Sequence, residues 1–146
     1  MKKIFFLVTF ITLLGITFAQ ESKVPIPDTR IVEAFGQETV DYLLQTSPRT
    51  IEYYNFFLDE SYTISEIPQE KVHDLRDMLP FTLKNPAIGE MPDFSAEGLK
   101  KLNILRFNIN IHPVMGAIYR LGNTNKIIVF YSGDEITRKF KESQNQ

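Results

Sequence analysis

Apolar and polar residues alternate without interruption from Arg106 to His112, RFNINIH. A period of two is typical of a strand with one buried face. It predicts a strand near Leu102 to Ile111 whose outer face carries four polar side chains: Arg106, Asn108, Asn110 and His112. These side chains could contact an extended polar ligand such as a sugar, a peptide or a carboxylate. Alternatively, they form the solvated face of an antiparallel sheet, and we favour this second interpretation.

The same period continues toward the C-terminus. Strands are expected near Ala117 to Leu121 and Lys126 to Tyr131, with turns at HPVMG and GNTN between successive strands. KIIVFY is apolar on both faces, which predicts a central strand covered by helices or by another chain. A further short strand is expected at Ser61 to Ile67.

A spacing of three to four residues between apolar positions predicts helices elsewhere. The first covers Ile31 to Leu44, with Asp28 or Thr29 as N-cap, although Gly36 weakens it or marks close packing. The second covers Thr50 to Asp59, preceded by Ser47 and Pro48. Two more are expected: one after Pro68 with Val72, Leu75 and Leu79 on one side, and a last one that starts at the capping box of Ser132 and Glu135 and buries Ile136 and Phe140.

These elements predict an α+β fold. The N-terminal helices and the C-terminal helix pack on a mostly antiparallel sheet of three to five strands, which ends in a C-terminal meander. Residues 29–143 are expected to form a single domain, and residues 144–146 a frayed tail.

The first residues have the pattern of a targeting segment. Lys2 and Lys3 precede an apolar run and the small-residue pattern Thr17-Phe18-Ala19, which predicts a signal peptide over residues 1–19, cut after Ala19. The run is shorter than the roughly 20 apolar residues of a membrane span, so cleavage is favoured over anchoring. Residues 20–28 hold two prolines and are expected to form an extended tether. These features predict a periplasmic or secreted protein that is not inserted in the membrane after cleavage.

Charge and composition exclude several classes of partner and of chemistry. Without Lys2 and Lys3 the chain holds 14 basic and 18 acidic side chains and has no basic run, so nucleic acid is not an expected partner. The absence of cysteine removes disulfides and thiol nucleophiles. His73 and His112 are the only histidines and lie far apart in sequence, so neither a metal nor another cofactor is expected.

Nothing in the sequence has the pattern of a catalytic site. There is no G-x-S-x-G motif, and helix capping accounts for Ser132. Carboxylates are present, but a glycosidase pair is defined by a distance that the sequence does not give. Catalysis, as by a hydrolase using His112 or clustered carboxylates, is therefore the least favoured hypothesis, although it stays open.

The second helix contains IEYYNFFL and is apolar nearly all round. Such a helix is either buried on several sides, which we favour, or offers a partner surface formed by Tyr53, Phe56 and Phe57. A second candidate partner surface is the tip of the hairpin YRLGNTNK, with Tyr119, Arg120 and Asn123. The long segment from Pro80 to Phe94 is either a lid or a cover that packs Phe81, Leu83, Ile88 and Met91 on the core.

The whole string, from MKKIFFL through FAQES to YRLGNT and FYSGDEI, resembles small exported proteins of Bacteroidetes-type bacteria without an assigned activity. The resemblance implies a periplasmic or outer-envelope location and a role as an accessory of secretion or surface machinery, and it carries over no functional residue. The leading hypothesis is a non-enzymatic interaction module with an envelope protein as partner, with self-association left open. The alternative is a small polar-ligand binder that uses the face from Arg106 to His112.

Overall fold

The computed structural model describes residues 24–87 and 90–145. The signal peptide expected at residues 1–19 lies outside these ranges, as do residues 20–23 of the expected tether. Residues 24–28 of the tether have no regular secondary structure.

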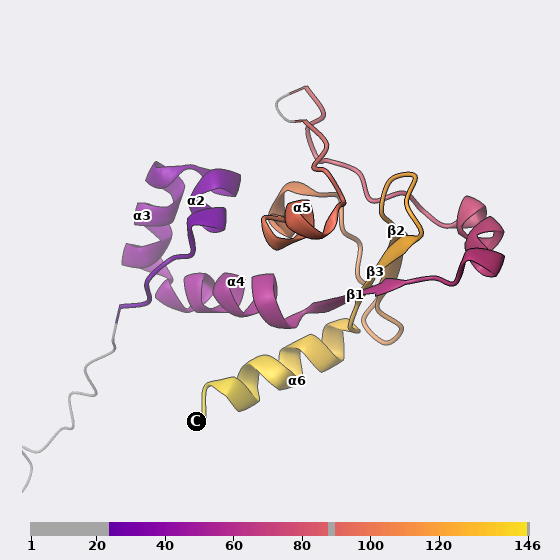
Figure 1. Ribbon diagram of the computed structural model, residues 1–146. Helices are drawn as coiled ribbons and strands as arrows, with labels where there is room; N and C mark the ends of the chain where they lie inside the picture. Colours follow the sequence, from indigo (N-terminus) through magenta and orange to yellow (C-terminus); the bar gives the residue numbers. More distant parts are fainter. Residues whose placement is uncertain (1–23, 88–89, 146) are drawn as a thin grey trace, which may run out of the picture.

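The fold is α+β, with a three-stranded antiparallel sheet (Figure 1). The strands are β1 (Tyr62–Glu66), β2 (Ala117–Arg120) and β3 (Lys126–Phe130), in the order β1-β3-β2. Phe130 of β3 faces Tyr62 of β1 and Ala117 of β2. The doubly apolar KIIVF segment is thus the central strand, as its sequence predicts.

The prediction of a strand from Leu102 to Ile111 is wrong in part, because only the other two strands of the predicted meander, β2 and β3, form. The first residues of this range make a short 3-10 helix, η2 (Ile104–Arg106). The buried side chain of Asn103 explains this turn, because its Oδ1 accepts from the Leu105 N–H at 3.3 Å while its Nδ2 donates to the Arg30 carbonyl at 2.7 Å. Residues 107–112 then run extended and pair only at isolated positions.

Residues 79–84 explain why this extended chain does not join β2. They lie between the two, since Pro80 pairs in parallel with Arg120 of β2 while Leu83 pairs antiparallel with Phe107. The Phe81 N–H donates to the Arg120 carbonyl at 3.0 Å, and the Lys84 N–H donates to the Arg106 carbonyl at 2.9 Å. Two irregular extended segments therefore widen the sheet beyond β2.

Three helices form the N-terminal part: α2 (Thr29–Phe35), α3 (Gln37–Thr46) and α4 (Pro48–Glu60). The single helix expected over residues 31–44 is wrong, because Gly36 has φ +81° and separates α2 from α3. The predicted cap at Asp28 is confirmed, since its side chain accepts from the Arg30 N–H at 2.8 Å. Pro48 opens α4 as expected.

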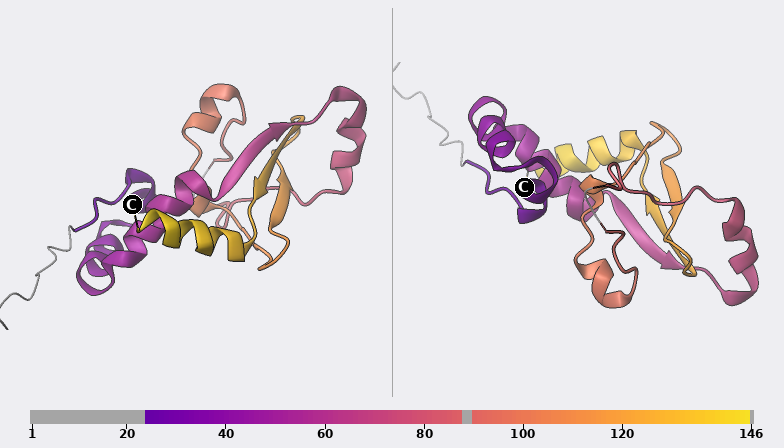
Figure 2. Two further views of the ribbon diagram at one scale, coloured as in Figure 1. Left: turned by 90° about the horizontal axis from the view of Figure 1, so that it is seen from below. Right: turned by 90° about the horizontal axis from the view of Figure 1, so that it is seen from above.

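The last helix, α6 (Gly133–Ser143), begins as its capping box predicts, with Ser132 Oγ accepting from the Glu135 N–H at 3.2 Å. It packs beside α4 (Figure 2). The ring of Phe140 lies 5.3 Å from that of Tyr53 and 5.5 Å from that of Phe56.

Two short helices complete the described chain: η1 (Gln69–Asp77), a 3-10 helix, and α5 (Ala96–Lys100). The sequence predicts a helix after Pro68, and η1 lies there; of the three residues predicted to share one side, Leu75 is buried. Leu79 does not share that buried side, because η1 ends at Asp77 and the Leu79 carbonyl accepts instead from the Arg120 N–H at 3.0 Å.

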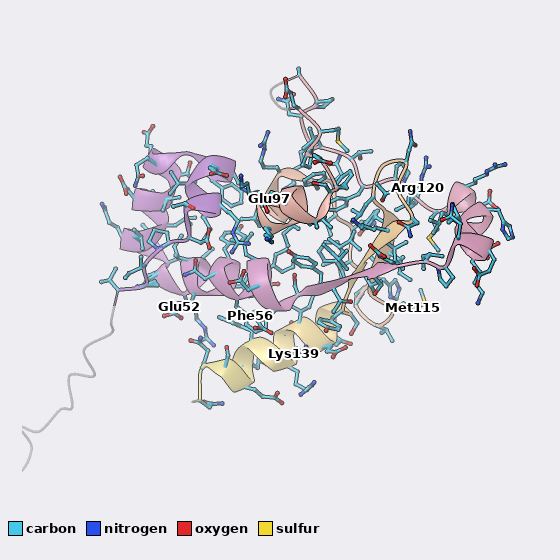
Figure 3. The ribbon with its side chains drawn as sticks, viewed as in Figure 1. Glu52, Phe56, Glu97, Met115, Arg120 and Lys139 are labelled. Carbon is cyan, nitrogen blue, oxygen red and sulfur yellow. The ribbon has the colours of Figure 1, made fainter. Side chains whose placement is uncertain are left out.

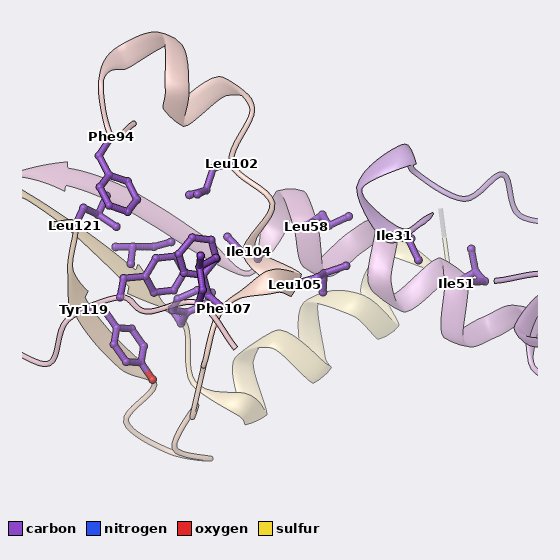
Figure 4. Close-up of a cluster of buried hydrophobic side chains, with 14 of the residues drawn as sticks. Ile31, Ile51, Leu58, Phe94, Leu102, Ile104, Leu105, Phe107, Tyr119 and Leu121 are labelled. Atoms are coloured by element: carbon purple, nitrogen blue, oxygen red, sulfur yellow. The ribbon is translucent and has the colours of Figure 1, made fainter. Parts of the chain in front are cut away.

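The core runs from the sheet to the N-terminal helices (Figure 4). Phe81, Leu83 and Phe94 are buried in it. The described part of the segment from Pro80 to Phe94 is therefore a core cover, although Met91 remains 48% exposed and Ile88 lies outside the described residues.

Candidate binding groove

Three hollows lie along the chain from Ile104 to Ile111, and we call them together the groove. The central hollow, the aromatic cleft, has a volume of about 320 Å³. Its lining is Phe35, Tyr53, Tyr54, Phe57, Lys84, Ile104, Leu105, Phe107, Ile109 and Ile111. The second, the Glu33 hollow, contains Arg106 and shares Phe35 and Leu105 with the cleft. The third, the polar hollow, is lined by Thr82, Asn108, Asn110 and Tyr119, among others, and shares Ile109 with the cleft. Lys84 lines all three.

One wall of the aromatic cleft comes from α4 and the end of α2. Tyr53 and Phe57 are one helical turn apart on α4, with ring centroids 6.0 Å apart. Phe35, the last residue of α2, places its ring 5.0 Å from that of Tyr54. Burial raises the pKa of the Tyr53 phenol, and the neighbouring Tyr54 adds to this. The wall therefore offers ring faces, and the phenol of Tyr53 stays neutral at physiological pH.

The opposite wall is the extended chain. Phe107 is buried, while Ile109 and Ile111 are half-buried and line the cleft. The alternation of RFNINIH is thus observed in burial, although the segment is not a regular strand. Its apolar positions complete a cleft with an apolar lining.

Two cations lie along the groove. Lys84 and Arg106 are both exposed, and neither makes an ion pair with any residue in the described ranges. The only carboxylate in the three linings is that of Glu33, which accepts a hydrogen bond from Asn103 Nδ2 at 3.3 Å. The groove therefore has a positive rim on a chain whose net charge is −2.

The four polar side chains of the RFNINIH row have different surroundings. Asn108 Nδ2 donates to the Leu83 carbonyl at 3.1 Å, which ties the two extended segments together. His112 Nδ1 accepts from the N–H groups of Val114 and Met115, each at 3.2 Å, and so closes the turn that follows. The Asn110 N–H donates to Tyr119 Oη at 2.8 Å. This last bond is made by the Asn110 main chain, so among the described residues the side chains of Arg106 and Asn110 make no hydrogen bond.

The structure separates the residues expected on partner surfaces. Tyr53 and Phe57 line the aromatic cleft, whereas Phe56 lies between α4 and α6, against Phe140 (Figure 3). Tyr119 lines the polar hollow. Arg120 and Asn123 line a different depression, beside η1.

Lys84, Phe35 and Tyr54 are groove residues that the sequence does not single out. Lys84 stands in a proline-containing segment without periodicity, so no pattern indicates its neighbours. Phe35 and Tyr54 have the spacing of ordinary core positions, and their ring contact joins the end of α2 to α4.

Two features are absent from the described residues, 24–87 and 90–145. They contain no group of three or more His, Cys, Asp or Glu side chains placed to hold a metal ion. No helix among them is both long enough and apolar enough to cross a membrane.

Comparisons of the chain with protein-family models, with curated proteins and with solved structures found no match.

Proposed function

We propose that this protein is a non-enzymatic interaction module that holds a segment of a protein partner in the groove. The observation that carries the proposal is the aromatic cleft, flanked by two further hollows and bordered by Lys84 and Arg106, which have no counter-ion in the described chain. Together with the predicted signal peptide, this suggests a partner in the cell envelope.

The shape and chemistry of the groove support a peptide segment as ligand. The aromatic cleft and the Glu33 hollow share Phe35, Lys84 and Leu105, so together they suit an elongated ligand more than a compact one. Aromatic side chains give large contact area at a low cost in side-chain entropy, which is why Tyr and Phe are enriched at the centre of interfaces. The cations at the rim add selectivity for an acidic residue in the segment.

The test is selection from a displayed library of random peptides against the protein purified after expression of the whole chain. Enriched peptides should contain an apolar or aromatic residue and an Asp or Glu. Lys84→Glu should weaken their binding by about ten-fold or more, since it puts a negative charge beside the cleft. Lys71→Glu is the matched control, because Lys71 is exposed on η1 and lines none of the three hollows.

Three outcomes would contradict the proposal. These are the absence of any enriched peptide, a peptide whose binding is equally sensitive to both lysine variants, and amide chemical-shift changes confined to residues outside the groove. The whole chain is also run on a sizing column with light scattering, which tests whether a second copy takes part.

A small polar ligand on the row from Arg106 to His112 is the second candidate. It has less support, because Asn108 and His112 already make contacts that hold the fold. This second hypothesis predicts that Asn110→Leu abolishes stabilisation by such a ligand. The interaction-module hypothesis predicts that the same variant still binds the peptide.

A further inference from the structure

The extended chain from Phe107 to His112 is hydrogen-bonded along one edge only. On that edge the Asn108 N–H donates to the Thr82 carbonyl at 2.8 Å, and the His112 N–H donates to the Gly116 carbonyl at 3.0 Å. Main-chain groups alternate in direction along an extended chain, so those of Ile109 and Ile111 face the other way. Neither the N–H nor the carbonyl of these two residues has a hydrogen-bond partner among residues 24–87 and 90–145.

From this edge we infer how the partner is recognised: its segment binds as an added strand, with main-chain hydrogen bonds to Ile109 and Ile111. This inference rests on the proposed function, which it deepens by naming the binding mode. Strand addition draws affinity from main-chain bonds and specificity from the alternate side chains of the added strand.

The position of the aromatic cleft sets the side-chain pattern of the partner. The side chains of Ile109 and Ile111 both line this cleft. A partner residue paired opposite either of them points its side chain to the same face of the sheet, toward Tyr53 and Tyr54. The added strand should therefore carry an apolar or aromatic residue at alternate positions.

Charge complementarity identifies the other part of the pattern. Lys84 lines the cleft and Arg106 lies in the neighbouring hollow, both without a counter-ion in the part of the chain that the structure describes. The occupant is thus an extended segment of a protein with alternating apolar residues and at least one carboxylate.

A second free edge provides the internal control. The Tyr131 N–H donates to the Ser61 carbonyl and the Ile67 N–H to the Asn125 carbonyl, so residues 61, 63, 65 and 67 face β3. Ile64 of β1 consequently turns its main-chain groups away from β3. Ile64 lines none of the three hollows of the groove, so this edge lacks the apolar cleft that a partner side chain needs.

The experiment is amide hydrogen exchange, read by NMR on the whole chain as purified, with and without the most strongly enriched peptide from the library. Strand addition predicts that the Ile109 and Ile111 amides exchange at least about ten-fold more slowly with the peptide bound, whereas the Ile64 amide does not change. Slower exchange at Ile64 alone would overturn the assignment of the edge.

Two proline variants give an independent test. Ile109→Pro removes an N–H from the proposed binding edge and should lower the affinity for the peptide by about ten-fold or more. Ile64→Pro removes an N–H from the other edge and should leave this affinity unchanged. Should Ile109→Pro not fold, the exchange rates of the unmodified chain decide alone.

The results separate the two proposals. A peptide that shifts Tyr53 and Tyr54 signals but leaves the Ile109 and Ile111 exchange rates unchanged would overturn strand addition and leave the proposed function standing. A library without any enriched peptide would overturn both. Replacing the acidic residue of the peptide by lysine should reduce its affinity, and an unchanged affinity would overturn the role given to Lys84 and Arg106.

Discussion

The ring of Phe81 lies flat against the ring of Phe107, with centroids 4.0 Å apart and planes inclined by 5°. Both side chains are almost fully buried, and they belong to the two extended segments that widen the sheet. This stacked pair fixes the position of residues 107–111, and so it fixes one wall of the aromatic cleft.

Phe81→Ala should therefore lower the free energy of unfolding by about 3–5 kcal/mol, the usual loss for a large aromatic side chain in a core. Urea unfolding followed by circular dichroism measures this. Tyr42→Ala is the control, because Tyr42 is 63% exposed and its loss should change stability by no more than about 0.5 kcal/mol. Equal effects of the two variants would mean that Phe81 does not pack as described.

Asp28 combines a helix cap with an ion pair, and the two roles can be separated. Its Oδ1 accepts from the Arg30 N–H, and its Oδ2 lies 2.8 Å from Arg30 Nη2. Asp28→Asn keeps the cap and removes the charge, so it should cost about 1 kcal/mol or less for this partly exposed pair. Asp28→Ala removes both and should cost about 1 kcal/mol more. Urea unfolding at pH 7 compares the three chains.

The same pair predicts a pH dependence. The hydrogen bond from the Arg30 guanidinium lowers the pKa of the Asp28 carboxyl below its usual value. The stabilisation is therefore complete above the unfolded pKa of about 3.9 and is lost as the pH falls through the folded pKa. The difference in unfolding free energy between the natural chain and Asp28→Asn should shrink as the pH is lowered through this range. A constant difference would show that the carboxylate charge is not responsible.

Gly116 stands where the turn before β2 closes against the end of β3. Its φ is +76°, and a Cβ at this position would clash with the Phe130 carbonyl oxygen. Gly116→Ala should destabilise the fold by more than about 3 kcal/mol, because backbone strain and a steric clash add. Gly36→Ala has a similar φ of +81° but no atom within 4 Å of the new Cβ, so only the strain remains. Thermal unfolding should show the larger loss for Gly116→Ala.

The serines before α6 and α4 should respond differently to removal of the hydroxyl. Ser132 caps α6 by accepting from the Glu135 N–H, so Ser132→Ala should cost about 1 kcal/mol. Ser47 occupies the N-cap of α4, but its hydroxyl instead contacts the Thr50 hydroxyl at 2.8 Å and caps no N–H. Ser47→Ala should therefore cost less than Ser132→Ala when both are measured by urea unfolding.

The parts of the fold that the sequence predicts well are those where local pattern and tertiary packing agree. KIIVF is apolar on both faces and becomes the central strand between β1 and β2. Ser132 and Glu135 mark the start of α6 because a capping box is a local device, independent of distant residues.

The failures occur where distant contacts override local pattern. The alternation of RFNINIH correctly separates the buried or half-buried side chains from the exposed ones, but residues 79–84 take the place beside β2 that a regular meander would give this segment. The spacing of apolar residues continues across Gly36 and so predicts one helix. The positive φ of Gly36, which that spacing does not indicate, divides α2 from α3. Local pattern does not indicate the groove for the same reason: Lys84 and Tyr54 belong to segments that no local signal connects, and they line one cleft only in the folded chain.

The central position of β3 has a consequence for the order of events in folding. This strand occupies residues 126–130, whereas its partner β1 occupies residues 62–66. A chain made from its N-terminus onward has α2, α3 and α4 available early, but it lacks the only strand that can join β1 to β2. Sheet assembly must therefore wait until nearly all of the described chain is present, and the pairing of β1 with β3 closes a loop of about 60 residues at the step we expect to limit the folding rate.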